Sequence, residues 1–141
     1  ESGFLHWGHD ISPEENQYEA DLVFAISYKK DADFIGKDAL LKMKNKEQLK
    51  SFVMLSLKDK SPGNPLLLHD EPIYLDNKII GRTTSGNYSF NYKRNLSFGY
   101  IDYKFKDEVL DSKNIYIEVA KCKYPASIET KPLKDKKVRL S

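Results

Sequence analysis

From residue 50 onward, short apolar runs alternate with turn residues at close intervals. The runs are rich in β-branched and aromatic residues and are bounded by Gly, Pro, Asn or Asp, which is typical of strands. They cover residues 52–57, 72–75, 78–84, 96–103, 115–120 and 124–130. Strands at this spacing predict a small antiparallel barrel or a sandwich.

Two short segments predict hairpins within this part of the chain. Asp76-Asn77 is a turn pair between two of the runs, and residues 121–123 separate the last two. A two-residue Asp-Asn link favours a tight hairpin. The run ending in residues 83–86 consists of four small residues, Thr-Thr-Ser-Gly, which allow a backbone to approach a ligand or another chain closely.

Residues 1–47 show a different pattern. Ser12 followed by Pro13 is typical of a turn or a short helix start. The apolar stretch at residues 22–26 predicts a strand buried on both faces. A helix is expected to begin at Asp33 or Gly36. Its apolar side would be formed by Phe34, Ala39, Leu40, Leu41 and Met43. The predicted fold class is therefore mainly β with a short α/β N-terminal segment.

Composition bounds the class of protein. The chain has 141 residues, a formal net charge of +2 and an apolar fraction of 40%. Its length predicts one domain, or one domain with a piece of another, and its small charge predicts neither a nucleic-acid partner nor a membrane partner. Cys122 is the only cysteine, which fits a reducing compartment such as the cytoplasm. Because the chain starts at Glu1 without Met, we interpret it as a fragment of a longer protein.

His6 and His9 flank Trp7-Gly8, with Asp10 next, and both residue types can bind metals. The spacing is weak, and His69 stands far away in the sequence. Loop packing and hydrogen bonding is the favoured interpretation, so no metal site is expected.

Five segments, taken together and in order, resemble the folate-dependent aminomethyltransferase family, whose type member is the T-protein of glycine cleavage. They are His-Trp-Gly-His-Asp-Ile at 6–11, Glu-Ala-Asp-Leu-Val-Phe at 19–24, Asp-Phe-Ile-Gly-Lys-Asp-Ala-Leu at 33–40, Gly-Arg-Thr-Thr-Ser-Gly at 81–86 and Leu-Ser-Phe-Gly-Tyr-Ile at 96–101. The first segment is most similar to the C-terminal half of dimethylglycine and sarcosine dehydrogenases.

The resemblance implies a small antiparallel β-barrel as the C-terminal domain at residues 48–141, and the tail of an upstream folate-binding domain at residues 1–47. It implies one-carbon transfer from an N-methyl or aminomethyl donor to tetrahydrofolate, with a small methylated amine as substrate. The family's catalytic aspartate would lie outside this chain, so no catalytic residue is assigned here. FAD would belong to a domain absent from this chain, which carries no Gly-x-Gly-x-x-Gly fingerprint.

Three residues match positions that the resemblance associates with folate. Glu1 would pair with N–H donors on the pterin edge, Phe24 would stack on the ring, and Arg139 would meet the glutamate tail through its planar fork. The structural alternatives are a frayed chain end for Glu1, a core side chain for Phe24 and a disordered basic tail for Arg139. The alternative function is a non-catalytic β-barrel module that binds protein or RNA.

Overall fold

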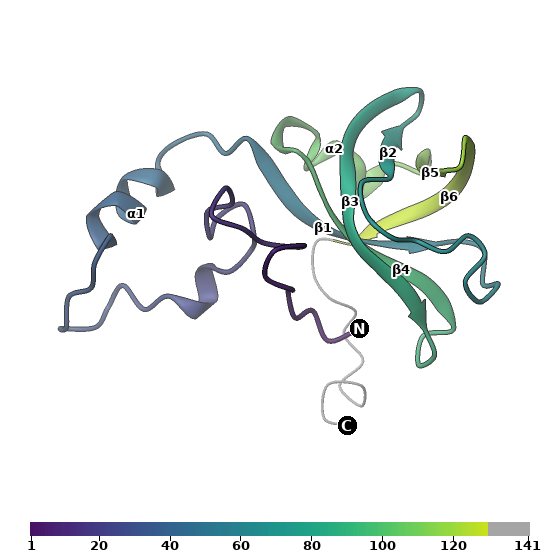
Figure 1. The fold of residues 1–141 in the computed structure, drawn as a ribbon. Coiled ribbons are helices and arrows are strands. Elements are labelled where there is room, and N and C mark those ends of the chain that lie inside the picture. The colour runs from purple at the N-terminus through teal and green to yellow at the C-terminus, as the bar shows by residue number, and fades with distance from the viewer. Residues whose placement is uncertain (130–141) are drawn as a thin grey trace.

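The computed structural model describes residues 1–129, and in this part of the chain six antiparallel strands close into a barrel (Figure 1). The strands are β1 (Lys50–Leu57), β2 (Pro72–Leu75), β3 (Lys78–Ser89), β4 (Arg94–Asp102), β5 (Ile115–Val119) and β6 (Cys122–Glu129). Their order around the barrel is β1-β4-β3-β2-β5-β6. Short helices η2 (Tyr103–Phe105) and α2 (Glu108–Asp111) link β4 to β5. The barrel that the family resemblance implies is confirmed, and of the barrel and the sandwich left open by the strand spacing the barrel is present.

The barrel interior is filled by aliphatic side chains from every strand. Alternate residues of β1 point inward, as the two-residue period of a strand requires. The buried cluster comprises Val53, Leu55, Leu57, Leu67, Ile73, Leu75, Ile80, Ile101, Phe105, Val109, Ile115, Ile117, Ala126 and Ile128. Burial of each large side chain contributes about 1.5–3 kcal/mol, so this cluster supplies the main driving force for folding.

The outer face of β1 and β4 is also buried. Phe52 packs against Phe98 and Tyr100, with ring centroids 5.1 and 5.6 Å apart. The backbone N–H of Phe52 donates to the carbonyl of Glu19 at 2.8 Å. The Tyr100 hydroxyl donates to the carbonyl of Asp10 at 2.8 Å. These contacts attach the N-terminal segment to the outside of the barrel.

The two predicted hairpins are present, one of them with a shifted turn. Asp76 takes a φ of 54° between β2 and β3. The last turn is formed by Ala120 and Lys121, with φ values of 49° and 67°, one residue earlier than expected. Cys122 already pairs with Val119, because two consecutive residues with positive φ suffice to reverse the chain.

The N-terminal segment has little regular structure and stands beside the barrel (Figure 1). The predicted strand at residues 22–26 is wrong: this stretch forms the 3₁₀ turn η1 (Val23–Ala25). Its N–H groups bond locally, Ala25 to the carbonyl of Leu22 at 3.0 Å. The predicted helix after Gly36 is confirmed as α1 (Lys37–Lys44), but none of its residues is buried.

A bulge and two glycines shape the pairing of β3 with β4. Residues 83–86 lie within β3, and the register shifts between Thr83 and Ser85. A Cβ on Gly81 would stand 2.0 Å from the carbonyl oxygen of Tyr100, and one on Gly99 would stand 2.6 Å from that of Arg82. Only glycine permits this close approach of the two strands.

Candidate functional site

The loop at residues 6–11 is held in a compact turn by several backbone hydrogen bonds. The carbonyl of His6 accepts from the N–H groups of His9 and Asp10 at 3.2 and 2.8 Å, and Gly8 donates to Ile11 at 2.8 Å. The rings of His6 and His9 lie 4.8 Å apart. These contacts involve the backbone and one pair of rings, and both imidazoles are exposed. Within residues 1–129 no group of three or more His, Cys, Asp or Glu side chains could hold a metal ion.

Asp10 anchors this loop to the barrel through a buried carboxylate. Its Oδ1 accepts from the hydroxyls of Thr84 at 2.6 Å and Ser85 at 2.7 Å. Its Oδ2 accepts from the backbone N–H of His6 at 2.9 Å. Consecutive side chains of a regular strand point to opposite faces, so the bulge in β3 is what turns both hydroxyls toward one oxygen.

A second anchor joins Ser12, Glu15 and Lys50. Glu15 accepts from the backbone N–H and the hydroxyl of Ser12, both at 2.7 Å. Its other oxygen accepts from Lys50 at the start of β1. Burial raises the pKa of Glu15, but the hydrogen bonds from Lys50 and Ser12 outweigh burial and leave the pKa below its ordinary value. The carboxylate is therefore held ionised.

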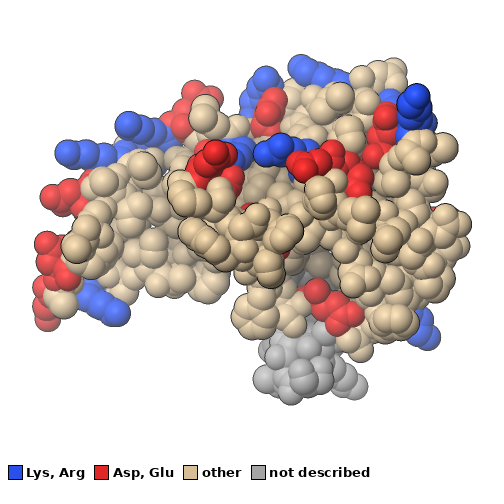
Figure 2. Space-filling model, in the orientation of Figure 1, with Lys and Arg blue, Asp and Glu red and all other residues tan. Residues whose placement is uncertain are grey.

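An open groove of about 810 Å³ separates this loop from the outer face of the barrel. Basic and acidic side chains lie next to one another across this face (Figure 2). Lys50 is paired with Glu15, and Arg82 with Asp70 at 3.3 Å. Both cations that line the groove are thus paired with neighbouring acids.

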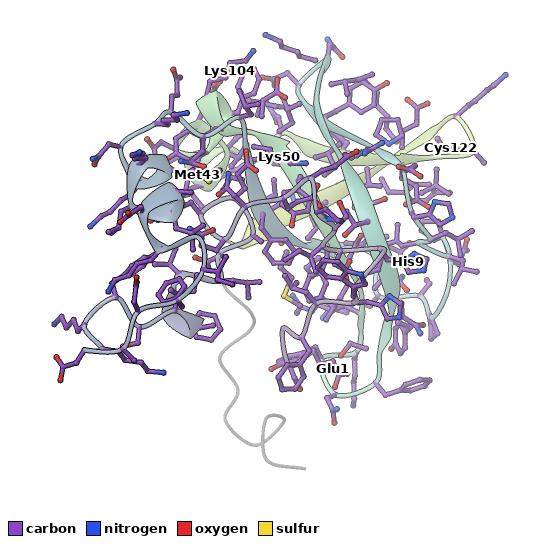
Figure 3. The ribbon with its side chains drawn as sticks, turned by 60° about the vertical axis from the view of Figure 1, so that its left-hand side comes forward. Glu1, His9, Met43, Lys50, Lys104 and Cys122 are labelled. Carbon is purple, nitrogen blue, oxygen red and sulfur yellow. The ribbon has the colours of Figure 1, made fainter. Side chains whose placement is uncertain are left out.

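Glu1 lies against the turn between β3 and β4 (Figure 3). One carboxylate oxygen accepts from the hydroxyl of Ser89 and from the backbone N–H of Asn91 at 3.4 Å, and the other accepts from the Asn91 side chain at 2.6 Å. The side-chain hydrogen bonds from Ser89 and Asn91 lower the pKa of Glu1. Glu1 is therefore a positioned carboxylate and not a frayed end.

Glu1 also borders a hollow of about 280 Å³ on the outer face of β3 and β4. Its lining joins apolar and small polar side chains: Met54, Leu96 and Phe98 with Ser85, Gly86, Asn87, Tyr88, Ser89 and Ser97. An ionised carboxylate beside an apolar wall suits a flat ring with N–H donors on its edge. The residues present thus fit the edge of a pterin.

Phe24, the second residue expected to contact folate, is 84% exposed. The alternative interpretation as a core side chain is wrong, because the stretch around Phe24 forms a turn and finds no partner strand. No hydrogen bond or ring contact among residues 1–129 joins Phe24 to Glu1. Arg139, the third residue, lies outside the described residues.

Phe24 belongs to a set of large apolar side chains that the N-terminal segment exposes. We call this set the N-terminal apolar surface: Phe4, Trp7, Phe24, Ile35, Leu41, Met43 and Leu49. Met43 lies on α1 (Figure 3) and lines a pocket together with Leu49 and Lys50. Seven exposed large apolar side chains within 49 positions leave apolar area that another part of a longer protein can cover. The sequence pattern had assigned several of them to a core.

A closed barrel of this order, with an N-terminal segment clamped to its outside, defines a C-terminal barrel domain. Residues 50–135 match the model of the glycine cleavage T-protein C-terminal barrel domain. This chain belongs to that family. Its fold is similar to the crystal structure of the glycine cleavage system aminomethyltransferase T from Bartonella henselae, with a TM-score of 0.73 and 21% identity over 90% of this chain and 34% of the other.

Similarity to curated proteins extends over the N-terminal segment as well. The chain is 35% identical to 4-methylaminobutanoate oxidase (formaldehyde-forming) of Paenarthrobacter nicotinovorans, over 97% of its own length and 16% of the relative. It is 34% identical to mitochondrial dimethylglycine dehydrogenase of Homo sapiens, over 94% of its own length and 15% of that relative. The chain is 38% identical to an aminomethyltransferase of Listeria welshimeri, over 68% of its own length and 25% of that relative. The chain thus spans a quarter or less of the length of these relatives.

The described part of the chain contains no helix with the length and apolar character needed to cross a membrane.

Proposed function

We propose that this chain acts as the C-terminal part of a tetrahydrofolate-dependent enzyme of the aminomethyltransferase type. The enzyme would transfer a one-carbon unit from an N-methyl or aminomethyl donor, with a small methylated amine as substrate. Family membership supports this proposal, as do the names of relatives that act on methylated amines. The free cysteine, Cys122, is the basis for proposing a reducing compartment, the cytoplasm.

The N-terminal apolar surface is the observation that carries the proposal. Asp10 and Glu15 anchor the N-terminal segment to the barrel. The large apolar side chains of that segment nevertheless face solvent. An exposed apolar surface of this kind is stable in water when another body covers it. The folate-binding part of a longer enzyme, which the relatives' lengths leave room for, is the cover we propose.

Within this proposal, tetrahydrofolate is the acceptor of the one-carbon unit. Glu1 would bind the pterin edge with its ionised carboxylate, Phe24 would offer an aromatic face for stacking, and Arg139 would pair with the glutamate tail. The chain's own contribution is to bind and orient the folate. In the dehydrogenase branch of the family, a flavin in a separate domain would carry out the oxidation.

The test compares this chain with a longer enzyme that contains it. Isothermal calorimetry with tetrahydrofolate should show weak or no binding to residues 1–141, because one wall of a cleft supplies only part of the contacts. Assays with dimethylglycine and with an aminomethyl donor should show no turnover by this chain. Turnover or tight folate binding by residues 1–141 would overturn the proposed location of the site.

The longer enzyme should bind tetrahydrofolate tightly. Absence of folate binding there, together with salt-sensitive RNA binding, would instead identify a binding module.

A further inference from the structure

The turn between β3 and β4 holds Glu1 by a specific arrangement of donors. Ser89 is 3% exposed, and its hydroxyl oxygen accepts from the backbone N–H of Tyr92 at 3.0 Å. A hydroxyl has a single proton to donate, and in Ser89 that proton is directed to Oε1 of Glu1. The turn therefore fixes both the position of the Ser89 hydroxyl and the direction in which it donates.

Asn91 holds the second carboxylate oxygen. Its side-chain amide donates to Oε2 at 2.6 Å, and its backbone N–H approaches Oε1 at 3.4 Å. Donors on both oxygens prevent rotation of the carboxylate about its terminal torsion, which is otherwise broad. The turn thus orients Glu1 as well as keeping it ionised.

We propose that Ser89 and Asn91 are positioning residues that hold the Glu1 carboxylate for a ligand with N–H donors on its edge. This inference rests on the proposed function, in which that ligand is a folate. An ionised carboxylate can accept about four hydrogen bonds. Ser89 and Asn91 use three of these, two short and one long at 3.4 Å. Among the bonds formed by residues 1–129, one acceptor position on Oε2 stays open, and a second becomes available when the long bond is released.

The position of the turn fits this role. Ser89 and Glu1 line the same hollow on the outer face of β3 and β4, so the oriented carboxylate stands at a concave site. Because Ser89 and Asn91 lie 88 and 90 residues after Glu1, only the folded barrel can bring them to it. The barrel domain would thereby contribute Ser89 and Asn91 to a folate site that also uses Glu1 and Phe24 from the N-terminal segment.

The test is a double-mutant cycle on a longer enzyme that contains this chain, with 5-formyltetrahydrofolate as the calorimetric probe. Asn91→Ala should raise the dissociation constant about tenfold, the factor expected for loss of a hydrogen bond to a charged group. In a Glu1→Ala background, Asn91→Ala should cause no further change. Ser89→Ala should follow the same rule, and Ser89→Thr, which keeps the hydroxyl, should restore affinity.

Asn114→Ala is the matched control. The Asn114 amide donates to the Asp76 carboxylate at 2.7 Å, an exposed bond of the same kind at the other end of β3. It should leave folate affinity unchanged. Equal weakening by Asn91→Ala in both backgrounds, or none in either, would overturn the positioning role. If Glu1→Ala itself leaves affinity unchanged, the folate assignment of Glu1 in the proposed function fails first.

Discussion

Asp10 and Thr84 are 74 residues apart, yet the Thr84 hydroxyl donates to Oδ1 of Asp10 at 2.6 Å. Ser85 donates to the same oxygen, so two strand hydroxyls converge on one buried carboxylate. The convergence depends on the bulge in β3. Strand β3 of the barrel therefore holds the N-terminal segment in place through Asp10.

We expect Asp10→Asn to destabilise the chain by about 2 kcal/mol. An asparagine keeps one oxygen for Thr84 and Ser85, but its NH₂ group then faces the backbone N–H of His6, which loses its acceptor. A buried donor without an acceptor costs about 1–3 kcal/mol. Urea denaturation at pH 7, followed by circular dichroism, measures the difference in unfolding free energy.

Asp102→Asn is the control for this change. Its carboxylate is 56% exposed and pairs with Lys104 at 3.5 Å, so the expected change is below about 0.5 kcal/mol. If both variants lose the same stability, the bond from the His6 N–H to Asp10 contributes nothing specific.

Glu15 should make stability depend on pH. Its pKa lies below the ordinary 4.5 in the folded chain, so its ionised form stabilises the fold above pH 4.5. That contribution is lost as the pH falls from 4.5 through the folded pKa. Glu15→Gln should be less stable than the parent at pH 7 by about 1–2 kcal/mol, and the gap should narrow at pH 3. Parallel urea titrations at the two pH values test this, and a gap that stays constant would contradict it.

Leu67 and its two neighbours offer a matched set on one loop. Leu67 is 1% exposed, whereas Leu66 and Leu68 are more than half exposed. Leu67 packs directly against Gly86. A Cβ on residue 86 would stand 2.5 Å from the Leu67 Cβ, so only glycine leaves room for Leu67. Leu67→Ala should cost about 2–5 kcal/mol, and Leu66→Ala or Leu68→Ala less than about 0.5 kcal/mol. Thermal and urea unfolding of the three variants decide the outcome.

Gly81→Ala should be among the most damaging changes in the barrel. Its new methyl group would meet the Tyr100 carbonyl oxygen at 2.0 Å, and both partners are backbone in paired strands. Overpacking of this kind costs about 1–3 kcal/mol or more. Ile79→Ala, two residues earlier and 56% exposed, is the control. A Gly81→Ala variant as stable as the Ile79→Ala variant would show that β3 and β4 can move apart enough to accommodate the new methyl group.

The barrel could be predicted from the sequence because its information is local. The apolar run of β1 and the Asp76-Asn77 turn each identify one element, whereas the order of the strands around the barrel had no such signal. The turn at Ala120 and Lys121 was misplaced by one residue, since its positive φ values have no signal in residue type. Neither Ala nor Lys is typical of such turns.

The N-terminal segment could not be predicted in the same way. An apolar run such as residues 22–26 becomes a strand only where a neighbouring strand accepts its hydrogen bonds. The structure shows none beside it among residues 1–129, and the run forms η1. The Asp10 and Glu1 contacts were missed because their partners lie 74 to 90 residues away. The only available signal was the small polar run at Thr84-Ser85.

Phe24→Ala should separate a ligand contact from a structural role. Because Phe24 is 84% exposed, its removal should change the unfolding free energy of residues 1–141 by less than about 0.5 kcal/mol. In a longer enzyme that contains this chain, the same change should weaken tetrahydrofolate binding by about 1 kcal/mol, the scale of an aromatic stacking contact. Phe52→Ala, at a 7% exposed site on the outside of β1, should show the opposite pattern, with stability lost first. Unchanged folate affinity in the Phe24→Ala enzyme would remove Phe24 from the folate site and leave it as part of the surface that another body covers.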